Sequence, residues 1–252
     1  MQSRFQWLVS SAAMLAVACA AAGASRSLAQ APPVFPGSEF SFSIGYFQPS
    51  GESDVWQGNS QYLTLDTSDF DGAVWGAAFA THLSPNFDFQ VTGQFYGATD
   101  NVAYRSYVDE FGYPFEQSHT FTEFPIDLSF RFLPLPRMKP GGQRGGGVLR
   151  SVVPYFGGGI GAVIWDYTAE GWFVDDLVFP SMAYYEQRSS GGIAPSIHAL
   201  AGLEIECSPW VAIWFEARYR WAQASLGGDF AYGPQDLDLG GGSLSVGTSF
   251  RF

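Results

Sequence analysis

The chain has 252 residues, a formal net charge of −12, 17% aromatic residues and only 14% charged residues. This acidic balance argues against nucleic acid as a partner, because a phosphate backbone is attracted to basic surfaces. Beyond the N-terminal segment, no stretch reaches the roughly 18 consecutive apolar residues that a membrane helix requires. Insertion into a membrane through helices is therefore excluded.

The N-terminal segment has the pattern of a secretory signal peptide. A basic residue, Arg4, precedes an apolar run over residues 12–22, and Ser27-Leu28-Ala29 is a suitable cleavage site before Gln30. We predict a cleaved signal peptide over residues 1–29, a short linker over residues 30–38 and one domain over residues 39–252.

The two cysteines bear on two questions: whether the N-terminus belongs to a lipoprotein, and whether an intrachain disulfide can form. A lipoprotein would carry its lipid on Cys19, but Ala16-Val17-Ala18 is a poor match to the Leu-rich sequence that usually precedes such a cysteine. Once the signal peptide is removed, Cys207 is the sole cysteine, so no intrachain disulfide can form.

Eight segments of the remaining chain alternate apolar and polar residues with the period of a β-strand. In the segment near Thr122–Phe132, for example, Phe124, Ile126 and Leu128 alternate with polar or charged residues. We expect strands near Glu39–Gln48, Gly72–Leu83, Asn86–Ala98, Thr122–Phe132, Val152–Tyr167, Ala194–Glu206, Val211–Trp221 and Ser243–Phe252. The segment Val152–Tyr167 is nearly apolar on both faces, and its register stays open. We favour Phe156, Ile160 and Ile164 pointing outward.

The connections between these segments differ in length in a regular way. Short Ser-Pro turns follow the second and sixth segments, whereas long polar connections cover residues 49–71, 99–121, 168–192 and 224–239. Residues 133–151 are the exception, a long basic connection where a short turn is expected. We interpret it as a flexible excursion at the end of the short turns.

An even number of strands with an apolar outer face satisfies the rule that every backbone polar group in lipid must be paired. We therefore predict an all-β fold, an antiparallel eight-stranded transmembrane up-and-down β-barrel. Aromatic residues near strand ends fit the two membrane interfaces, with Trp75, Trp165, Tyr167 and Trp221 at the outer one. A soluble sandwich or lipocalin-like barrel is the alternative, but such folds hide their aromatics inside, whereas this pattern places charges there.

Charged residues on the inward faces form the first candidate site. Eight strands leave an interior just wide enough for side chains, so opposed carboxylates and guanidinium groups would form an ion-pair core that closes the lumen. A narrow gated ion path is the functional alternative. The predicted lumen residues are Glu39, Asp88, Glu123, Asp127, Arg131, His198, Glu204, Glu216, Arg218, Arg220 and Arg251.

His198 also permits an enzymatic interpretation, with Ser196 as nucleophile and a nearby glutamate as the acid. The nucleophile would need a base within hydrogen-bond reach and access to substrate. Position 200, where deacylases of similar barrel size place their serine, is Leu. We therefore predict no catalytic residues, no metal and no cofactor.

The long connections combine acidic and aromatic residues, including Asp109, Glu170, Trp56 and Trp172. Loops on a rigid scaffold often carry recognition, so these connections could form a ligand-binding or adhesive rim. The simpler interpretation is an acidic surface bridged to lipopolysaccharide by divalent cations.

Three segments resemble the eight-stranded outer-membrane β-barrel superfamily, that is, the OmpA-type transmembrane domain and related porin-family barrel domains. They are residues 153–162 (VPYFGGGIGA), residues 214–220 (WFEARYR) and the terminal Ser249-Phe250-Arg251-Phe252. The resemblance implies a bacterial outer-membrane location, contact with outer-membrane lipid and lipopolysaccharide, and a C-terminal signal at Phe250 and Phe252 that the barrel-assembly machinery reads. The chain departs from full OmpA proteins because it ends at the barrel, without a peptidoglycan-binding domain.

This resemblance specifies architecture rather than activity. The favoured function is a non-enzymatic outer-membrane protein with a structural or surface-recognition role through four long extracellular loops and an extracellular ligand. The alternatives are a narrow conduit for small hydrophobic molecules or ions and, third, a lipid A-modifying enzyme.

Overall fold

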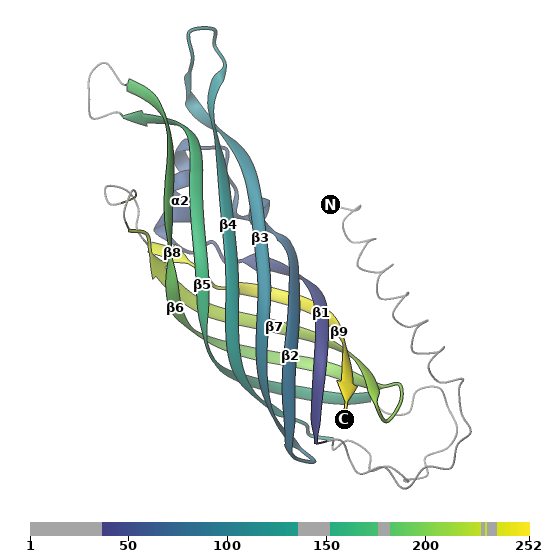
Figure 1. Ribbon diagram of the computed structural model, residues 1–252. Helices are drawn as coiled ribbons and strands as arrows, with labels where there is room; N and C mark the ends of the chain where they lie inside the picture. The colour runs from purple at the N-terminus through teal and green to yellow at the C-terminus, as the bar shows by residue number, and fades with distance from the viewer. Residues whose placement is uncertain (1–36, 136–151, 176–181, 228–229, 231–235) are drawn as a thin grey trace.

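The computed structural model describes residues 37–135, 152–175, 182–227, 230 and 236–252 (Figure 1). The predicted signal peptide, nearly all of the predicted linker and most of the basic connection over residues 133–151 lie outside these residues. No helix in the described part of the chain is long and apolar enough to cross a membrane.

A ring of eight antiparallel strands forms the barrel (Figure 1). Each strand pairs with the next, and the last strand pairs with both the seventh and the first, so the ring closes as predicted. The strands are β1 (Ser38–Pro49), β2 (Gly72–Ser84), β3 (Phe87–Val108), β4 (Pro114–Phe132), β5 (Val152–Asp175), β6 (Met182–Glu206), β7 (Val211–Ser225) and β9 (Gly241–Arg251).

Side chains alternate across the barrel wall along every strand. On β4, Phe124, Ile126 and Leu128 are each 42% exposed on the outside, whereas the intervening Glu123 and Asp127 are buried. The belt of exposed apolar residues on this strand runs from Phe124 to Phe132, a length that fits the roughly 9–11 residues of a tilted membrane strand. The outer wall is therefore a lipid-facing surface.

The register of β5 agrees with the favoured prediction. Phe156, Ile160 and Ile164 are exposed on the outside. Gly159 lies on the opposite face, where a Cβ atom would come within 1.8 Å of the carbonyl oxygen of Leu128. Glycine at this position lets β5 approach β4 closely.

Two hairpins extend far beyond the membrane belt, so the long polar connections predicted over residues 99–121 and 168–192 are mostly strands where the structure describes them. The strands β3 and β4 have 22 and 19 residues, and β5 and β6 have 24 and 25. We call the parts beyond Ala98 and Phe121 the β3–β4 arm and those beyond Tyr167 and Gly192 the β5–β6 arm. Sequence alternation fails there because neither face of an arm meets lipid, so both faces carry polar residues.

The connection after β1 folds over the barrel mouth rather than forming an open loop. It contains the helix α2 (Asp54–Tyr62) and a short 3-10 helix, η1 (Thr67–Phe70). Trp56 and Phe70 from this segment pack against Phe121 and Tyr167 from the barrel, with ring centroids 5.7–6.5 Å apart. We call this buried cluster, with its neighbours Tyr96 and Trp165, the mouth core.

The mouth core corrects two further expectations. Trp165 and Tyr167, predicted at the outer membrane interface, point into the barrel and are 5% and 0% exposed. Trp56, predicted in an exposed rim, is 1% exposed, and its indole nitrogen donates to the carbonyl oxygen of Asp238 in β8 (Asp236–Asp238). These aromatics fill the mouth instead of facing lipid or solvent.

Candidate functional site

The predicted lumen residues all lie on inward faces of the barrel and are at most 7% exposed. They come from six strands. The structure places Glu39 on β1, Asp88 on β3, Glu123, Asp127 and Arg131 on β4, His198 and Glu204 on β6, Glu216, Arg218 and Arg220 on β7, and Arg251 on β9. Their contacts fall into three layers along the barrel axis.

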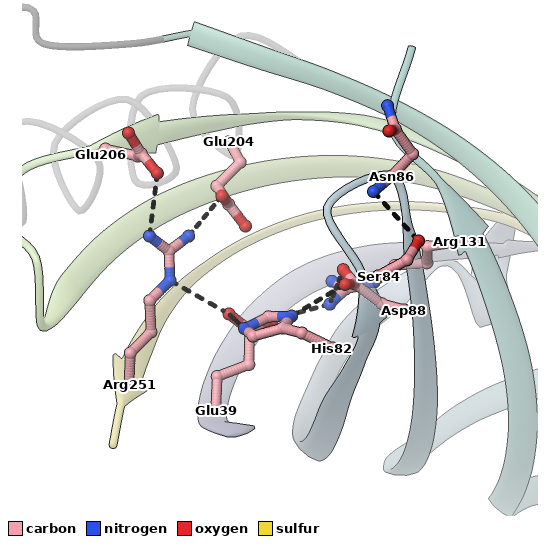
Figure 2. Close-up of polar contacts among 9 residues, drawn as sticks. All are labelled: Glu39, His82, Ser84, Asn86, Asp88, Arg131, Glu204, Glu206 and Arg251. Carbon is pink, nitrogen blue, oxygen red and sulfur yellow. Dashed lines mark hydrogen bonds and ion pairs between the residues drawn. The ribbon is translucent and has the colours of Figure 1, made fainter. Parts of the chain in front are cut away.

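The layer nearest the chain ends is centred on Glu39 (Figure 2). Its carboxylate accepts a hydrogen bond from Arg131 at 2.7 Å and lies 3.4 Å from Nε of Arg251. Arg131 also donates to Asp88 at 3.1 Å. A single carboxylate on β1 thus joins two guanidinium groups, from β4 and from β9.

Arg251 extends this layer to β6. It donates to Glu206 at 3.1 Å and to Glu204. His82 on β2 adds a contact that the sequence did not reveal, because its Nδ1 lies 2.8 Å from Asp88 Oδ1 (Figure 2). The alternation along β2 could have shown that His82 points into the lumen, because the buried residues Val74, Ala78 and Ala80 lie on the same face of the strand.

The middle layer is centred on Arg218. Its guanidinium donates to Asp127 at 2.7 Å and to Glu216 at 3.0 and 3.1 Å. Tyr155 on β5 donates its hydroxyl to Glu216 at 3.1 Å. Asp127 and Glu216 are therefore compensated by one arginine and a phenol, and strands β4, β5 and β7 are joined across the lumen.

The third layer lies directly below the mouth core. Arg220 donates to Glu123 at 3.1 Å and to Gln94 on β3 at 3.0 Å. Its guanidinium carbon is 5.9 Å from the centroid of the Phe47 ring, which packs against Tyr96 of the mouth core. The lumen thus passes from ion pairs directly into packed aromatics.

His198 does not use Ser196, the partner considered from the sequence. Its Nε2 is hydrogen bonded to Ser129 Oγ at 2.8 Å, and its Nδ1 lies 3.6 Å from Asp127 Oδ1. The order Ser129–His198–Asp127 resembles a hydrolase triad, but a nucleophile also needs access to substrate. Ser129 and Asp127 are 0% exposed and lie within the middle layer, which has a charged layer on either side.

A second buried histidine lies above the membrane belt, where β4 enters the β3–β4 arm. His119 Nδ1 is 2.6 Å from the hydroxyl of Tyr167, and its Nε2 is 2.9 Å from Gln117 Oε1. Asn59 of α2 donates to the same Tyr167 hydroxyl at 3.2 Å. Burial lowers the pKa of His119 to about 4, so the imidazole is neutral at neutral pH.

No group of three His, Cys, Asp or Glu side chains in the described residues is arranged to hold a metal ion. The carboxylates of Glu39, Asp127 and Glu123 instead each accept a hydrogen bond from an arginine, while Asp127 Oδ1 and Glu123 Oε1 have no hydrogen-bond partner among the described residues.

Comparison with known proteins gives a fold but no sequence relative. No protein-family model matches the chain, and no curated protein matches its sequence. The structure is similar to the outer membrane protein OprG from Pseudomonas aeruginosa, with a TM-score of 0.51 and 11% identity over 88% of this chain and 99% of OprG. At this identity the similarity establishes the shared fold alone.

Two further solved structures are less similar. Neisserial surface protein A (NspA) has a TM-score of 0.44 and 12% identity over 85% of this chain and 96% of NspA. Ail, the attachment invasion locus protein of Yersinia pestis, has a TM-score of 0.37 and 17% identity over 85% of this chain and 99% of Ail. The chain therefore shares the β-barrel fold of OprG, and its outer wall carries a belt of exposed apolar residues.

Removing one partner of a buried ion pair should destabilise the barrel strongly. We expect Arg220→Met to lower the free energy of unfolding by about 3–5 kcal/mol, because Glu123 is left buried without its cation. The double variant Arg220→Met/Glu123→Leu should recover most of this loss. Denaturant titration of the protein folded in lipid vesicles measures both values.

The exposed pair Arg188–Glu186 is the matched control. Arg188→Met should change the free energy of unfolding by less than about 1 kcal/mol, because water replaces the lost contact. Equal losses for Arg220→Met and Arg188→Met would contradict a closed ion-pair core.

Stability should also depend on pH through His119. Its folded pKa of about 4 lies below the value of about 6.5 in an unfolded chain, so between these values only the unfolded chain binds the proton. We expect stability to fall by up to about 3 kcal/mol as the pH is lowered from 6.5 to 4. His119→Gln should remove this part of the slope, and an equal slope in both proteins would refute the assignment.

Proposed function

We propose that this outer-membrane β-barrel is a non-enzymatic surface-recognition protein, in which a sealed barrel holds two rigid arms outside the cell. Outer-membrane barrels place short turns in the periplasm and long connections outside. The short β2–β3 and β6–β7 turns lie at the same end as Phe252, whose backbone pairs with Ser38. The arms therefore lie on the extracellular side.

The observation that carries this proposal is the contrast between the lumen and the arms. Three charged layers and the mouth core fill the barrel, whereas the arms expose large aromatic side chains to water. Phe111, Tyr113 and Tyr185 are 77%, 70% and 61% exposed. Exposed aromatic clusters beyond a membrane belt are typical of interaction surfaces.

The remaining roles follow from the same architecture. The ion-pair layers close the lumen and hold the strand register, because each links strands that are not neighbours in the sheet. Phe250 and Phe252 face outward on the last strand, 48% and 64% exposed, and supply the signal for the barrel-assembly machinery. Outer-membrane lipid and lipopolysaccharide cover the apolar belt.

Shortening the two arms tests this function. Replacing residues 104–115 and 172–185 each with Asn-Gly, a two-residue hairpin turn, keeps the belt and most of the mouth core. We expect the full-length protein in lipid nanodiscs to bind at least one ligand class on peptide and glycan arrays that the shortened barrel does not bind. A shift between boiled and unboiled samples on a gel checks that both variants fold. Identical binding by both folded proteins would exclude a recognition role for the arms.

One observation favours a conduit as the second candidate. The β3–β4 ladder passes from the pair Gly93↔Ile126 to the pair Tyr96↔Glu123, and Pro125 between them has no N–H to donate. On the inner side, Gln90 Oε1 and Thr92 Oγ1 are buried and have no hydrogen-bond partner in the described structure. A small molecule could enter the wall at this interruption.

Conductance separates the two candidates. We expect purified wild-type protein in planar bilayers to give no reproducible single-channel steps, because the charged layers and the mouth core block the lumen. Pro125→Val restores a backbone donor and serves as the control. Reproducible steps in the wild type that disappear in Pro125→Val would favour the conduit and contradict a sealed barrel.

A further inference from the structure

The β5–β6 arm carries two adjacent aromatic pairs that cross between its strands. Phe173 pairs with Tyr184, with ring centroids 6.3 Å apart, and Trp172 pairs with Tyr185, with centroids 5.8 Å apart. Each pair has a glutamate beside it, Glu186 or Glu170. The two pairs therefore have similar chemical composition.

The first pair holds a cation that the protein supplies itself. The guanidinium carbon of Arg188 lies 4.3 Å from the centroid of Phe173 and 6.0 Å from that of Tyr184. Arg188 donates to Glu186 at 2.9 Å and to the Tyr184 hydroxyl at 2.7 Å. An aromatic face combined with a carboxylate is a good binding site for a cationic side chain.

The second pair also combines two aromatic rings with a glutamate, but no arginine of the described residues lies over its rings. Trp172 and Tyr185 are 41% and 61% exposed, and the Tyr185 hydroxyl donates to Glu170 at 2.9 Å. Phe115 of the β3–β4 arm packs against Trp172, with centroids 5.5 Å apart, and widens the aromatic surface. Within the described ranges, cation–π contacts involve Arg131, Arg188 and Arg220, and none of them touches Trp172 or Tyr185.

The surrounding charge favours a cationic partner. The described arms carry Asp100, Asp109, Glu110 and Glu116 in addition to the two paired glutamates, against the arginines Arg105 and Arg188. Both arginines are engaged within the protein, since Arg105 donates to the carbonyl oxygens of Ser60 and Leu63. The resulting negative potential attracts a positively charged ligand and repels a polyanion.

The backbone next to these pairs suits an extended peptide. The β6–β7 ladder ends at Ser196↔Ala222, whereas β6 continues to Met182 and pairs there with β5. No other described strand has a ladder with residues 182–188 of β6, whereas farther along the same strand the Ser190 hydroxyl accepts a hydrogen bond from the Gly227 N–H. A sheet edge of this kind can accept an added strand, whose main chain supplies affinity while its side chains supply specificity.

We propose that Trp172, Tyr185 and Glu170 bind an arginine or lysine side chain from an extended basic segment of a partner protein. The contact copies the way in which Phe173, Tyr184 and Glu186 hold Arg188. The inference rests on the proposed recognition function and names the chemical class of its ligand.

Binding of a defined peptide tests the proposal. The probe is a fluorescent nine-residue peptide of alternating Arg and Thr, and its Glu-Thr counterpart is the charge control. The full chain is folded in nanodiscs of zwitterionic lipid, and binding is measured by fluorescence anisotropy. We expect Trp172→Ala to weaken binding about fivefold or more, and Glu170→Gln to weaken it about threefold. Tyr62→Ala, which removes an exposed aromatic of α2 outside the site, should leave the affinity unchanged.

Arg188→Ala gives an independent test in the opposite direction. It frees the Phe173–Tyr184 pair, so we expect a second Arg-Thr peptide to bind each barrel. Unchanged affinity in Trp172→Ala and Glu170→Gln, equal binding of the Glu-Thr peptide, or an unchanged peptide number in Arg188→Ala would each overturn the proposal. If the arrays show arm-dependent binding of a neutral glycan instead, the recognition function stands and this ligand class is wrong.

Discussion

The structure depends on the requirement that every backbone N–H and C=O group in a membrane must be hydrogen bonded within the protein. An unpaired group in hydrocarbon costs several kcal/mol, so a sheet can cross the bilayer only as a closed ring. Here β9 pairs with both β7 and β1 and closes the ring. This closure turns one face of every strand toward lipid and the other toward a narrow lumen.

The lumen then sets its own constraint, because charges buried there must find partners. Glu39 joins Arg131 and Arg251, and Arg218 joins Asp127 and Glu216, so the layers tie together strands on opposite sides of the ring. Removing one partner of such a pair lowers the stability strongly because the other charge remains buried and unpaired. The intact pair itself stabilises the fold little more than a well-packed apolar core would. The layers therefore fix the register and block the lumen more than they stabilise the barrel.

Above the belt, the two hairpins continue as strands instead of ending as loops. Cross-strand contacts such as Phe173–Tyr184 give the arms a defined shape without help from lipid. The Ser129–His198–Asp127 arrangement, by contrast, lies sealed between charged layers, where its serine cannot meet a substrate. Rigid exposed arms on a closed barrel suit binding at the surface better than chemistry or transport within it.

The sequence by itself determined the strand number and the inward and outward parity of most strands, whereas the register of Val152–Tyr167 stayed open. Apolar and polar residues alternate wherever one face of a strand meets lipid. This alternation assigns Glu123, Asp127 and Arg251 to the inward face, and all three are buried. It also made Arg251 a plausible partner for carboxylates, but it could not choose Glu204, Glu206 and Glu39 among several candidates.

Only the tertiary structure decided which aromatics turn inward at the mouth and which serine meets His198. Trp165 and Tyr167 lie near the end of the predicted strand Val152–Tyr167, whose register the sequence left open, although β5 itself continues to Asp175. Their burial comes from α2 and η1, which bring Trp56 and Phe70 over the mouth. Ser129 on β4 and His198 on β6 both pair with Gly159 of the intervening strand β5, so their contact depends on a residue that has no side chain to separate them. Such contacts join residues far apart in the chain, and no local periodicity encodes them.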